Sequence, residues 1–257
     1  EKRFGDKPFT RYFVKGCDGF IAMSKTVLND ISKFSDTKNK AFSPHPMYET
    51  YGKAVSMAEA RTHLKLNPDD KIILFFGLIR HYKGLDILLE AMSHPEIKNQ
   101  NIKLLVAGEF YEDKKPYLDL IKSKSLDNQV ILHDKFIPNE DVRYYFCASN
   151  LVAQTYRNAT NSGVTMVGYY YEKPMLVTNV GGLAEIVPDN ICGYVVENNV
   201  TLISETIIGY FKNDKEAEFT NNVIEERKKY EWTSFIKELL KLYQKSKTQT
   251  AKKQSDS

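Results

Sequence analysis

Residues Ile72 to Met92 read IILFFGLIRHYKGLDILLEAM, and this stretch decides the fold class of the chain. An apolar run ends at Gly77, a basic loop carries Arg80 and Lys83, and helical spacing of apolar residues begins after Gly84. The glycines permit close backbone approach, and the N-terminus of the helix offers N–H groups and a partial positive charge. The stretch therefore predicts a phosphate-binding corner.

A second segment has the same design. Lys173 to Val187 reads KPMLVTNVGGLAEIV, with Gly181 and Gly182 at the turn between an apolar run and a helical pattern. Two such corners in one chain indicate a nucleotide-linked ligand.

Apolar, β-rich runs alternate with helical patterns along the middle of the chain, as is typical of a parallel sheet covered on both faces. The expected strands are Lys71–Phe76, Lys103–Ala107, Gln129–Leu132, Leu151–Gln154, Met175–Thr178 and Gly193–Val196. The expected crossover helices, one to a connection, are Lys83–Met92, Lys115–Ser123, Asn139–Cys147 and Gly163–Tyr171. We therefore expect an α/β fold, a Rossmann-like doubly wound parallel sheet, with its ligand beyond the carboxyl ends of the strands.

The flanking regions divide the rest of the chain. Residues 1–46 resemble a fragment of a preceding α/β domain, with a strand at Gly19–Met23, a helix capped by Ser24 and the start of another strand at Ala41–Phe42. Residues 47–70 are expected to form a linker with one short helix, and residues 71–230 the ligand-binding domain. We expect a crossing helix at 231–246 and a disordered, lysine-rich tail at 247–257.

The expected last helix, Trp232 to Tyr243, carries apolar residues on one face and lysines on the other. Packing against the protein's own domains is the commoner role of such a helix. Weak peripheral contact with a membrane surface is the alternative.

Composition excludes several classes of function. Among 257 residues, 36 basic and 33 acidic side chains give a formal net charge of +3, too small an excess to indicate nucleic acid as a partner. The three cysteines form no CxxC pair and the five histidines no HExxH motif, so no metal site is expected. The first residues lack the apolar core of a signal peptide, and no apolar run is long enough for a membrane span. We expect a cytoplasmic protein, with action at the inner face of the membrane as the alternative.

Four segments carry a resemblance to a known family: FFGLIRHYKGLDILLEAM, LLVAGEF, FIPNEDVRYYFCASNLVAQTY and KPMLVTNVGGLAEIV. Together they resemble the donor-binding C-terminal domain of a GT-B glycosyltransferase of family 4, and CDGFIAMSKTVLNDISKF resembles the end of that family's first domain. The resemblance implies transfer of a sugar from a nucleotide diphosphate sugar to an acceptor hydroxyl, with retention at the anomeric carbon. It implies a saccharide or lipid-linked acceptor, a role in polysaccharide or glycoconjugate synthesis, and no cofactor or obligatory metal.

The resemblance also implies roles for particular residues. Arg80 and Lys83 would stabilise the leaving diphosphate as catalytic cations, the alternative being that they are exposed loop cations. The implied donor-binding residues are Gly77, Gly84, Gly108, Phe136, Ile137, Thr160, Asn161, Ser162, Gly163, Val164, Gly181, Gly182 and Glu185. For some of these a structural role is equally expected: a helix cap for Asn161 or Ser162, core packing for Phe136, and a first-turn carboxylate for Glu185.

The chain departs from the family at two positions. Family members carry glutamates, seven residues apart, that contact the donor sugar and the ribose, whereas Ala159 and Val167 occupy these positions here. Neither side chain can accept a hydrogen bond. A catalytically inactive, nucleotide-sugar-binding or regulatory relative is therefore the alternative function. A Rossmann oxidoreductase is disfavoured because no GxGxxG motif is present.

Overall fold

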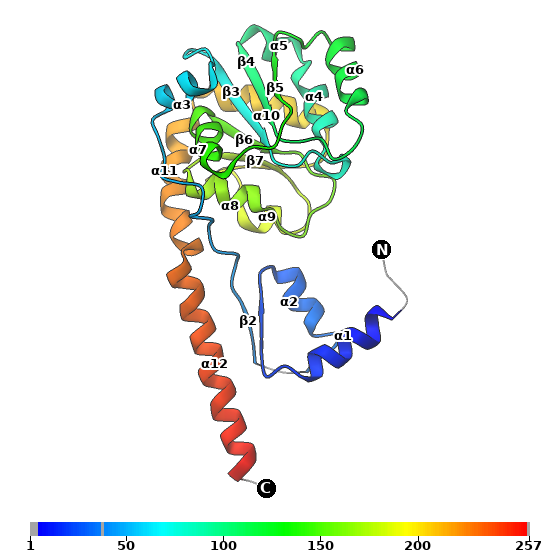
Figure 1. The fold of residues 1–257 in the computed structure, drawn as a ribbon, viewed down its shortest axis with the longest axis vertical. Helices are drawn as coiled ribbons and strands as arrows, with labels where there is room; N and C mark the ends of the chain where they lie inside the picture. The colour runs from blue at the N-terminus through cyan, green and yellow to red at the C-terminus, as the bar shows by residue number, and fades with distance from the viewer. Residues whose placement is uncertain (1–4, 37–38, 256–257) are drawn as a thin grey trace. The chain divides into compact units, whose positions relative to one another are not determined.

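The computed structural model describes residues 5–36 and 39–255, with side chains as far as Thr248. The chain divides into two compact units (Figure 1). One unit comprises Glu1–Pro46 with Lys229–Ser257, and the other comprises Met47–Lys228. Residues 47–70, expected from the sequence to be a linker, thus belong to the second unit.

The first unit contains two short parallel strands, β1 (Phe20–Ala22) and β2 (Lys40–Phe42), with Phe20 opposite Lys40. Its helices are α1 (Asp6–Lys15), α2 (Lys25–Ile31) and the long α12 (Trp232–Ser255). Ser24 caps α2, as its position in the sequence predicts, by accepting a hydrogen bond from the backbone N–H of Val27 at 3.2 Å.

Helix α12 is attached to this unit through polar and apolar contacts. The side-chain amide of Asn39 donates hydrogen bonds to the Ser246 hydroxyl and, at 2.7 Å, to the carbonyl of Asp18. Leu242 is buried, but much of the apolar face expected to pack remains exposed, with Trp232 at 46% and Leu240 at 53%.

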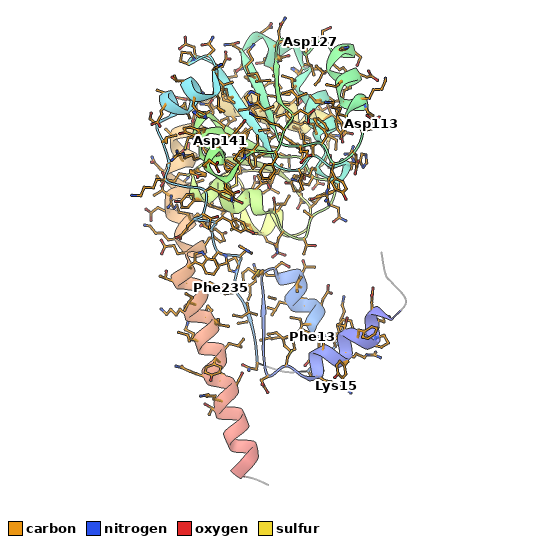
Figure 2. All side chains as sticks on the ribbon, in the orientation of Figure 1. Phe13, Lys15, Asp113, Asp127, Asp141 and Phe235 are labelled. Carbon is orange, nitrogen blue, oxygen red and sulfur yellow. The ribbon has the colours of Figure 1, made fainter. Side chains whose placement is uncertain are left out.

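Helix α12 is longer than expected, and α1 carries exposed aromatic side chains. Helix α12 continues to Ser255 through the segment expected to be disordered, where Lys, Gln and Ala are good helix formers; residues 256–257 lie outside the described part. On α1, Phe9, Tyr12 and Phe13 are 75%, 82% and 68% exposed, and Phe13 is labelled on this helix in Figure 2. No helix in the described part of the chain is both long and apolar enough to cross a bilayer.

The second unit is built on a parallel sheet of six strands in the order β5-β4-β3-β6-β7-β8. The strands are β3 (Lys71–Phe76), β4 (Ile102–Ala107), β5 (Val130–His133), β6 (Leu151–Gln154), β7 (Met175–Thr178) and β8 (Gly193–Val196). The helices are α3 (Met57–Leu64), η1 (His81–Lys83), α4 (Leu85–Met92), α5 (Pro95–Asn99), α6 (Lys115–Ser123), α7 (Asn139–Ala148), α8 (Gly163–Tyr170), α9 (Leu183–Ile186), α10 (Val200–Lys212), α11 (Glu216–Glu226) and η2 (Arg227–Tyr230). The predicted doubly wound α/β fold is confirmed.

The alternation of side chains along β3 shows how both faces of the sheet are covered. Ile73 and Phe75 belong to the core cluster formed with α4 and α10, while the ring of Phe76 packs edge-on against Phe146 of α7, with centroids 5.0 Å apart. Four consecutive residues of β3 are buried. A strand covered on both faces must be apolar throughout, which is why IILFF carries no polar residue.

Three details of the helices differ from the predictions. The connection from β3 to β4 holds two helices rather than one, because Pro95 starts α5 with the His94 ring as its cap. Lys83 lies in the turn η1 and α4 begins only at Leu85, since Gly84 has a left-handed φ of +67°. Helices α10 and α11 were not predicted.

Candidate functional site

The order of the strands places a crevice at the carboxyl ends of β3 and β6. The chain leaves β3 toward β4 on one side and later returns to β6 on the other, so the two loops that follow these strands diverge. Between them lies a cavity of about 280 Å³. It is lined by Tyr48, Tyr51, Phe76, Gly77, Tyr82, Lys83, Tyr156, Asn161, Ser162, Gly163, Val164 and Val167. A cavity at this edge of the sheet is what the sequence predicts.

Lys83 is the charged residue of this lining. Only 8% of it is exposed, and its ammonium nitrogen lies 3.1 Å from the position that a Cβ on Gly77 would occupy, so the glycine leaves room for it. The ammonium also lies 5.7 Å from the centroid of the Tyr156 ring. Burial, reinforced by the charge of Arg80, lowers the pKa of Lys83 from 10.5 to about 8. The described lining contains no Asp or Glu to neutralise it.

Arg80, the second predicted catalytic cation, does not line the cavity. Its guanidinium carbon lies 4.1 Å from the centroid of the Tyr111 ring, and its Nε is buried with no hydrogen-bond partner in the described part of the chain. In this arrangement Arg80 acts on the cavity through its electrostatic effect on Lys83.

The N-terminus of α8 borders the cavity with Ser162, Gly163 and Val164. Ser162 occupies the N-cap position, but its hydroxyl lies 3.3 Å from the Tyr156 hydroxyl and makes no capping hydrogen bond. The capping role considered for Ser162 is therefore wrong. The first turn of α8 can face an anion with its backbone N–H groups and partial positive charge.

Three glycines of the predicted site, Gly84, Gly181 and Gly182, hold loops together instead of lining the cavity. A Cβ on Gly84 would lie 2.0 Å from the carbonyl oxygen of Thr155, and one on Gly181, where φ is +49°, would lie 1.7 Å from that of Ala159. Gly182 donates its N–H to the carbonyl of Thr160 at 3.1 Å. The turn at Gly181 and Gly182 thus supports the loop after β6 and does not line the cavity.

The remaining predicted residues also lie outside the lining. Gly108 packs on the backbone of Gly77, Phe136 is 69% exposed, and Ile137 is buried at 7%. Glu185 lies in the first turn of the short helix α9. The structure therefore brings together Gly77, Lys83, Asn161, Ser162, Gly163 and Val164 from the predicted set.

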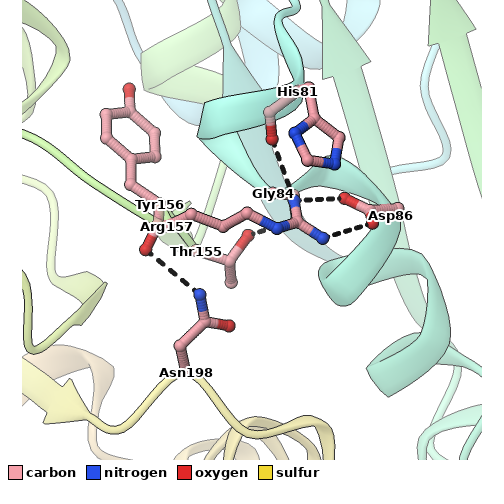
Figure 3. A network of polar contacts seen from close by, with 7 residues as sticks. All are labelled: His81, Gly84, Asp86, Thr155, Tyr156, Arg157 and Asn198. Carbon is pink, nitrogen blue, oxygen red and sulfur yellow. Dashed lines mark hydrogen bonds and ion pairs between the residues drawn. The ribbon is translucent and has the colours of Figure 1, made fainter. Parts of the chain in front are cut away.

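An ion pair that the sequence analysis did not predict joins the two loops. Arg157 donates two hydrogen bonds to the carboxylate of Asp86, at 2.8 and 2.5 Å, and a third to the carbonyl of His81 at 2.8 Å (Figure 3). Burial alone would raise the pKa of Asp86, but the hydrogen bonds and charge of Arg157, together with hydrogen bonds from the backbone of Asp86 and Ile87, outweigh burial and lower the pKa. Thr155 donates its hydroxyl to the carbonyl of Gly84 at 2.8 Å. These bonds fix the position of Lys83 relative to the N-terminus of α8.

The aromatic lining was also not predicted. Tyr82 packs edge-on against Tyr156, with centroids 5.8 Å apart, and the Tyr48 ring lies 3.3 Å from the position of a Cβ on Gly163. Tyr82 and Tyr156 lie shortly after the ends of β3 and β6, and this position in the sequence could have identified them as lining residues. Tyr48 and Tyr51 precede α3, and nothing in their local sequence indicates this site.

A protein-family model, glycosyl transferases group 1, matches residues 56–230, more than half of the chain. The chain belongs to this family. A relative described as an uncharacterized glycosyltransferase of Methanocaldococcus jannaschii is 26% identical over 92% of this chain and 62% of its own length. The lipopolysaccharide 1,2-N-acetylglucosaminetransferase of Salmonella typhimurium is 27% identical over 57% of this chain and 40% of its own length.

This chain resembles several solved structures in fold. Sucrose-phosphate synthase of Thermosynechococcus elongatus has a TM-score of 0.78 at 19% identity, covering 93% of this chain and 61% of that protein. The Anabaena protein HepE, solved with UDP and glucose, has a TM-score of 0.72 at 16% identity, covering 96% of this chain and 68% of that protein. These similarities confirm the predicted GT-B fold. The chain spans less than two thirds of the length of the first of these curated relatives.

Replacement of Lys83 by Met is expected to stabilise the free protein. Below pH 8 the folded state carries a desolvated ammonium, which lowers the free energy of unfolding. Between pH 8 and 10.5 the unfolded state binds more protons than the folded state, so the free energy of unfolding rises with pH and this destabilisation disappears. We expect Lys83→Met to raise the free energy of unfolding by about 1–3 kcal/mol at pH 7, with a smaller gain at pH 10. Urea denaturation at both pH values measures the difference in the free energy of unfolding. A variant less stable than the unchanged chain at pH 7 would contradict the burial of an uncompensated ammonium at Lys83.

Replacement of Gly84 by Ala is expected to disrupt the contact between the two loops. The left-handed φ and the 2.0 Å approach to Thr155 together should lower the free energy of unfolding by at least about 2 kcal/mol. Gly209→Ala is the matched control, because Gly209 lies within α10 with no atom nearer than 4.0 Å to an added Cβ. It should stabilise by up to about 1 kcal/mol. Equal stabilities of the two variants in urea denaturation would refute the packing described for Gly84.

Proposed function

We propose that this chain is the donor-binding part of a glycosyltransferase that moves a sugar from a nucleoside diphosphate sugar to an acceptor hydroxyl. The observation that carries the proposal is the buried ammonium of Lys83, which faces a cavity bordered by the N-terminus of α8 and free of carboxylates in its described lining. An anion such as a diphosphate supplies the charge that this cavity lacks. Membership of the group 1 glycosyl transferases supports the same ligand class.

The proposed mechanism follows from the position of this charge. Cleavage of the bond between the sugar and the diphosphate places growing negative charge on the leaving group, and a cation already fixed in a water-poor site stabilises it without reorganisation. Lys83 and the first turn of α8 supply this positive charge. The proposed reaction therefore needs no metal ion to receive the diphosphate.

Further features of the proposal come from the family resemblance. We propose retention of configuration at the anomeric carbon and an acceptor that is a saccharide or is lipid-linked, in polysaccharide or glycoconjugate synthesis. The Salmonella relative, whose name describes transfer to lipopolysaccharide, supports this acceptor class. Turnover by the complete enzyme with a panel of nucleotide sugars, followed by NMR assignment of the product's anomeric configuration, tests these features.

One observation favours a second function. The described lining of the cavity contains no carboxylate, and Val167 presents an apolar side chain where the family carries a glutamate. A relative that binds a nucleotide sugar without transferring it would show the same binding and no turnover. Binding together with transfer by the complete enzyme would eliminate this alternative.

Binding of a nucleoside diphosphate is the direct test of the proposed site. We expect calorimetry to detect UDP or GDP binding, and Lys83→Met to weaken it by about 10- to 100-fold, because a charge-assisted hydrogen bond contributes about 1.5–3 kcal/mol. Lys122→Met on α6 removes the same charge from an exposed position and should leave the affinity unchanged. Equal affinity of Lys83→Met and the unchanged chain would refute the role of Lys83.

The same binding should depend on pH. Since the pKa of Lys83 in the free protein is about 8, the ammonium loses its proton between pH 7 and 9, and binding of an anion must then recover it. We expect the affinity for a nucleoside diphosphate to fall by up to about tenfold from pH 7 to 9, and this fall to vanish in Lys83→Met. A flat profile in the unchanged chain would show that the anion does not bind beside Lys83.

A further inference from the structure

The first turn of α8 is approached by polar groups from two other segments. The ammonium of Lys83 and a methyl carbon of Val164 lie 3.1 and 3.8 Å from one point, the position of a Cβ on Gly77. The preceding residue of α8 meets Tyr48: a ring carbon and the hydroxyl oxygen of this tyrosine lie 3.3 and 3.6 Å from the position of a Cβ on Gly163. Consecutive Cα atoms are only about 3.8 Å apart. The ammonium and the phenol hydroxyl therefore lie beside the same helical turn.

Tyr48 belongs to a segment with no regular secondary structure. From Ser43 to Ser56 the chain forms neither a helix nor a strand. The rings of Tyr48 and Tyr51 lie 6.2 Å apart, and both line the cavity. Because no backbone ladder holds this segment, the position of the two rings depends on contacts with the helices beside them.

Tyr171, the C-cap residue of α8, supplies one of these contacts. Its hydroxyl lies 2.9 Å from the carbonyl oxygen of Tyr51 and 3.0 Å from that of Gly52, and it can donate its proton to either. Tyr171 is buried, its ring packs 5.7 Å from that of Phe146, and burial raises its pKa, so the hydroxyl stays a donor. Helix α8 thus contacts the segment at both of its ends, with Tyr48 at the N-terminus.

The chemistry of Tyr48 suits an anion at this turn. A phenol hydroxyl donates a hydrogen bond to a phosphate oxygen without adding a charge that would repel Lys83, and a hydrogen bond to a charged acceptor is stronger than one between neutral groups. The described lining of the cavity contains no carboxylate that would compete for this hydroxyl.

We propose that Tyr48 donates its hydroxyl to the diphosphate bound between Lys83 and α8, and that Tyr171 is the positioning residue that holds Tyr48 there. The inference rests on the proposed function and adds a binding residue to the same site. This residue comes from the segment before α3, outside the strand-to-helix corners that the sequence predicts.

Removal of the Tyr48 hydroxyl tests the contact on this chain. We expect Tyr48→Phe to weaken the binding of UDP by about tenfold, the lower end of the contribution of a hydrogen bond to a charged group. Inorganic pyrophosphate, measured by its displacement of UDP in calorimetry, should lose affinity by the same factor. Tyr12→Phe removes a hydroxyl from a side chain that is 82% exposed on α1 and should change neither affinity.

The outcomes of this experiment separate the two proposals. Unchanged UDP affinity in Tyr48→Phe, or a loss for UDP that pyrophosphate does not share, would overturn the inference and leave the proposed function standing. Absence of UDP and GDP binding by the unchanged chain would overturn both.

A larger truncation distinguishes a binding residue from an obstacle. If the Tyr48 ring only covers the first turn of α8 in the free protein, Tyr48→Ala opens the anion site and tightens UDP binding, which would overturn the inference. We expect Tyr48→Ala to weaken binding at least as much as Tyr48→Phe. Circular dichroism checks that both variants are folded.

A double-mutant cycle tests the positioning role of Tyr171. We expect Tyr171→Phe to weaken UDP binding by about threefold in the unchanged chain and to have no further effect in Tyr48→Phe, because the hydroxyl that it positions is then gone. Hydrogen exchange of the amides of residues 47–54 should become faster in Tyr171→Phe. Equal losses of affinity in both backgrounds would show that Tyr171 does not act through Tyr48.

Discussion

The structure of the candidate site depends on keeping the ammonium of Lys83 out of water at the carboxyl end of β3. Desolvation of a cation is unfavourable, and no carboxylate in the described lining compensates for it. The surrounding chain must therefore hold this conformation against the tendency of a lysine to extend into solvent. An unfavourable desolvation free energy of this kind is common at sites that bind a charged ligand, because the ligand then supplies the missing opposite charge.

The contacts between the loops explain how this position is maintained. Arg157 and Thr155 bind the backbone and side chain of the segment that carries Lys83, and Gly84 allows that segment to approach Thr155 closely. The charge of Arg157 is neutralised by Asp86, so it adds no free cation to the loop. The result is a preorganised corner in which the ammonium and the N-terminus of α8 face the same cavity, and the proposed stabilisation of a leaving diphosphate relies on this arrangement.

The lining of the cavity shows why only part of the site was predictable. Gly77 and Lys83 lie in the segment after β3, and the residues that begin α8 lie in the segment after β6. The topology brings the ends of these two strands together. Arg80 follows the same strand, yet it stacks on Tyr111 because that ring, from the loop after β4, lies within reach. Whether a loop cation turns toward a cavity or toward a neighbouring ring depends on contacts between loops that are distant in sequence.

The sequence by itself determined the doubly wound sheet, since apolar β-rich runs and helical periodicity are local patterns that the burial of both sheet faces imposes on each strand. It also predicted that Gly77 and Lys83 lie at the carboxyl edge of the sheet, since the loop that follows a parallel strand leaves the sheet at that edge. Only the tertiary structure decided that Tyr48 completes the cavity wall, that Arg157 pairs with Asp86, and that Gly181 supports a neighbouring loop. These are contacts between segments far apart in the chain, and their distances are fixed by the packing of the whole sheet and its helices, which no local pattern encodes.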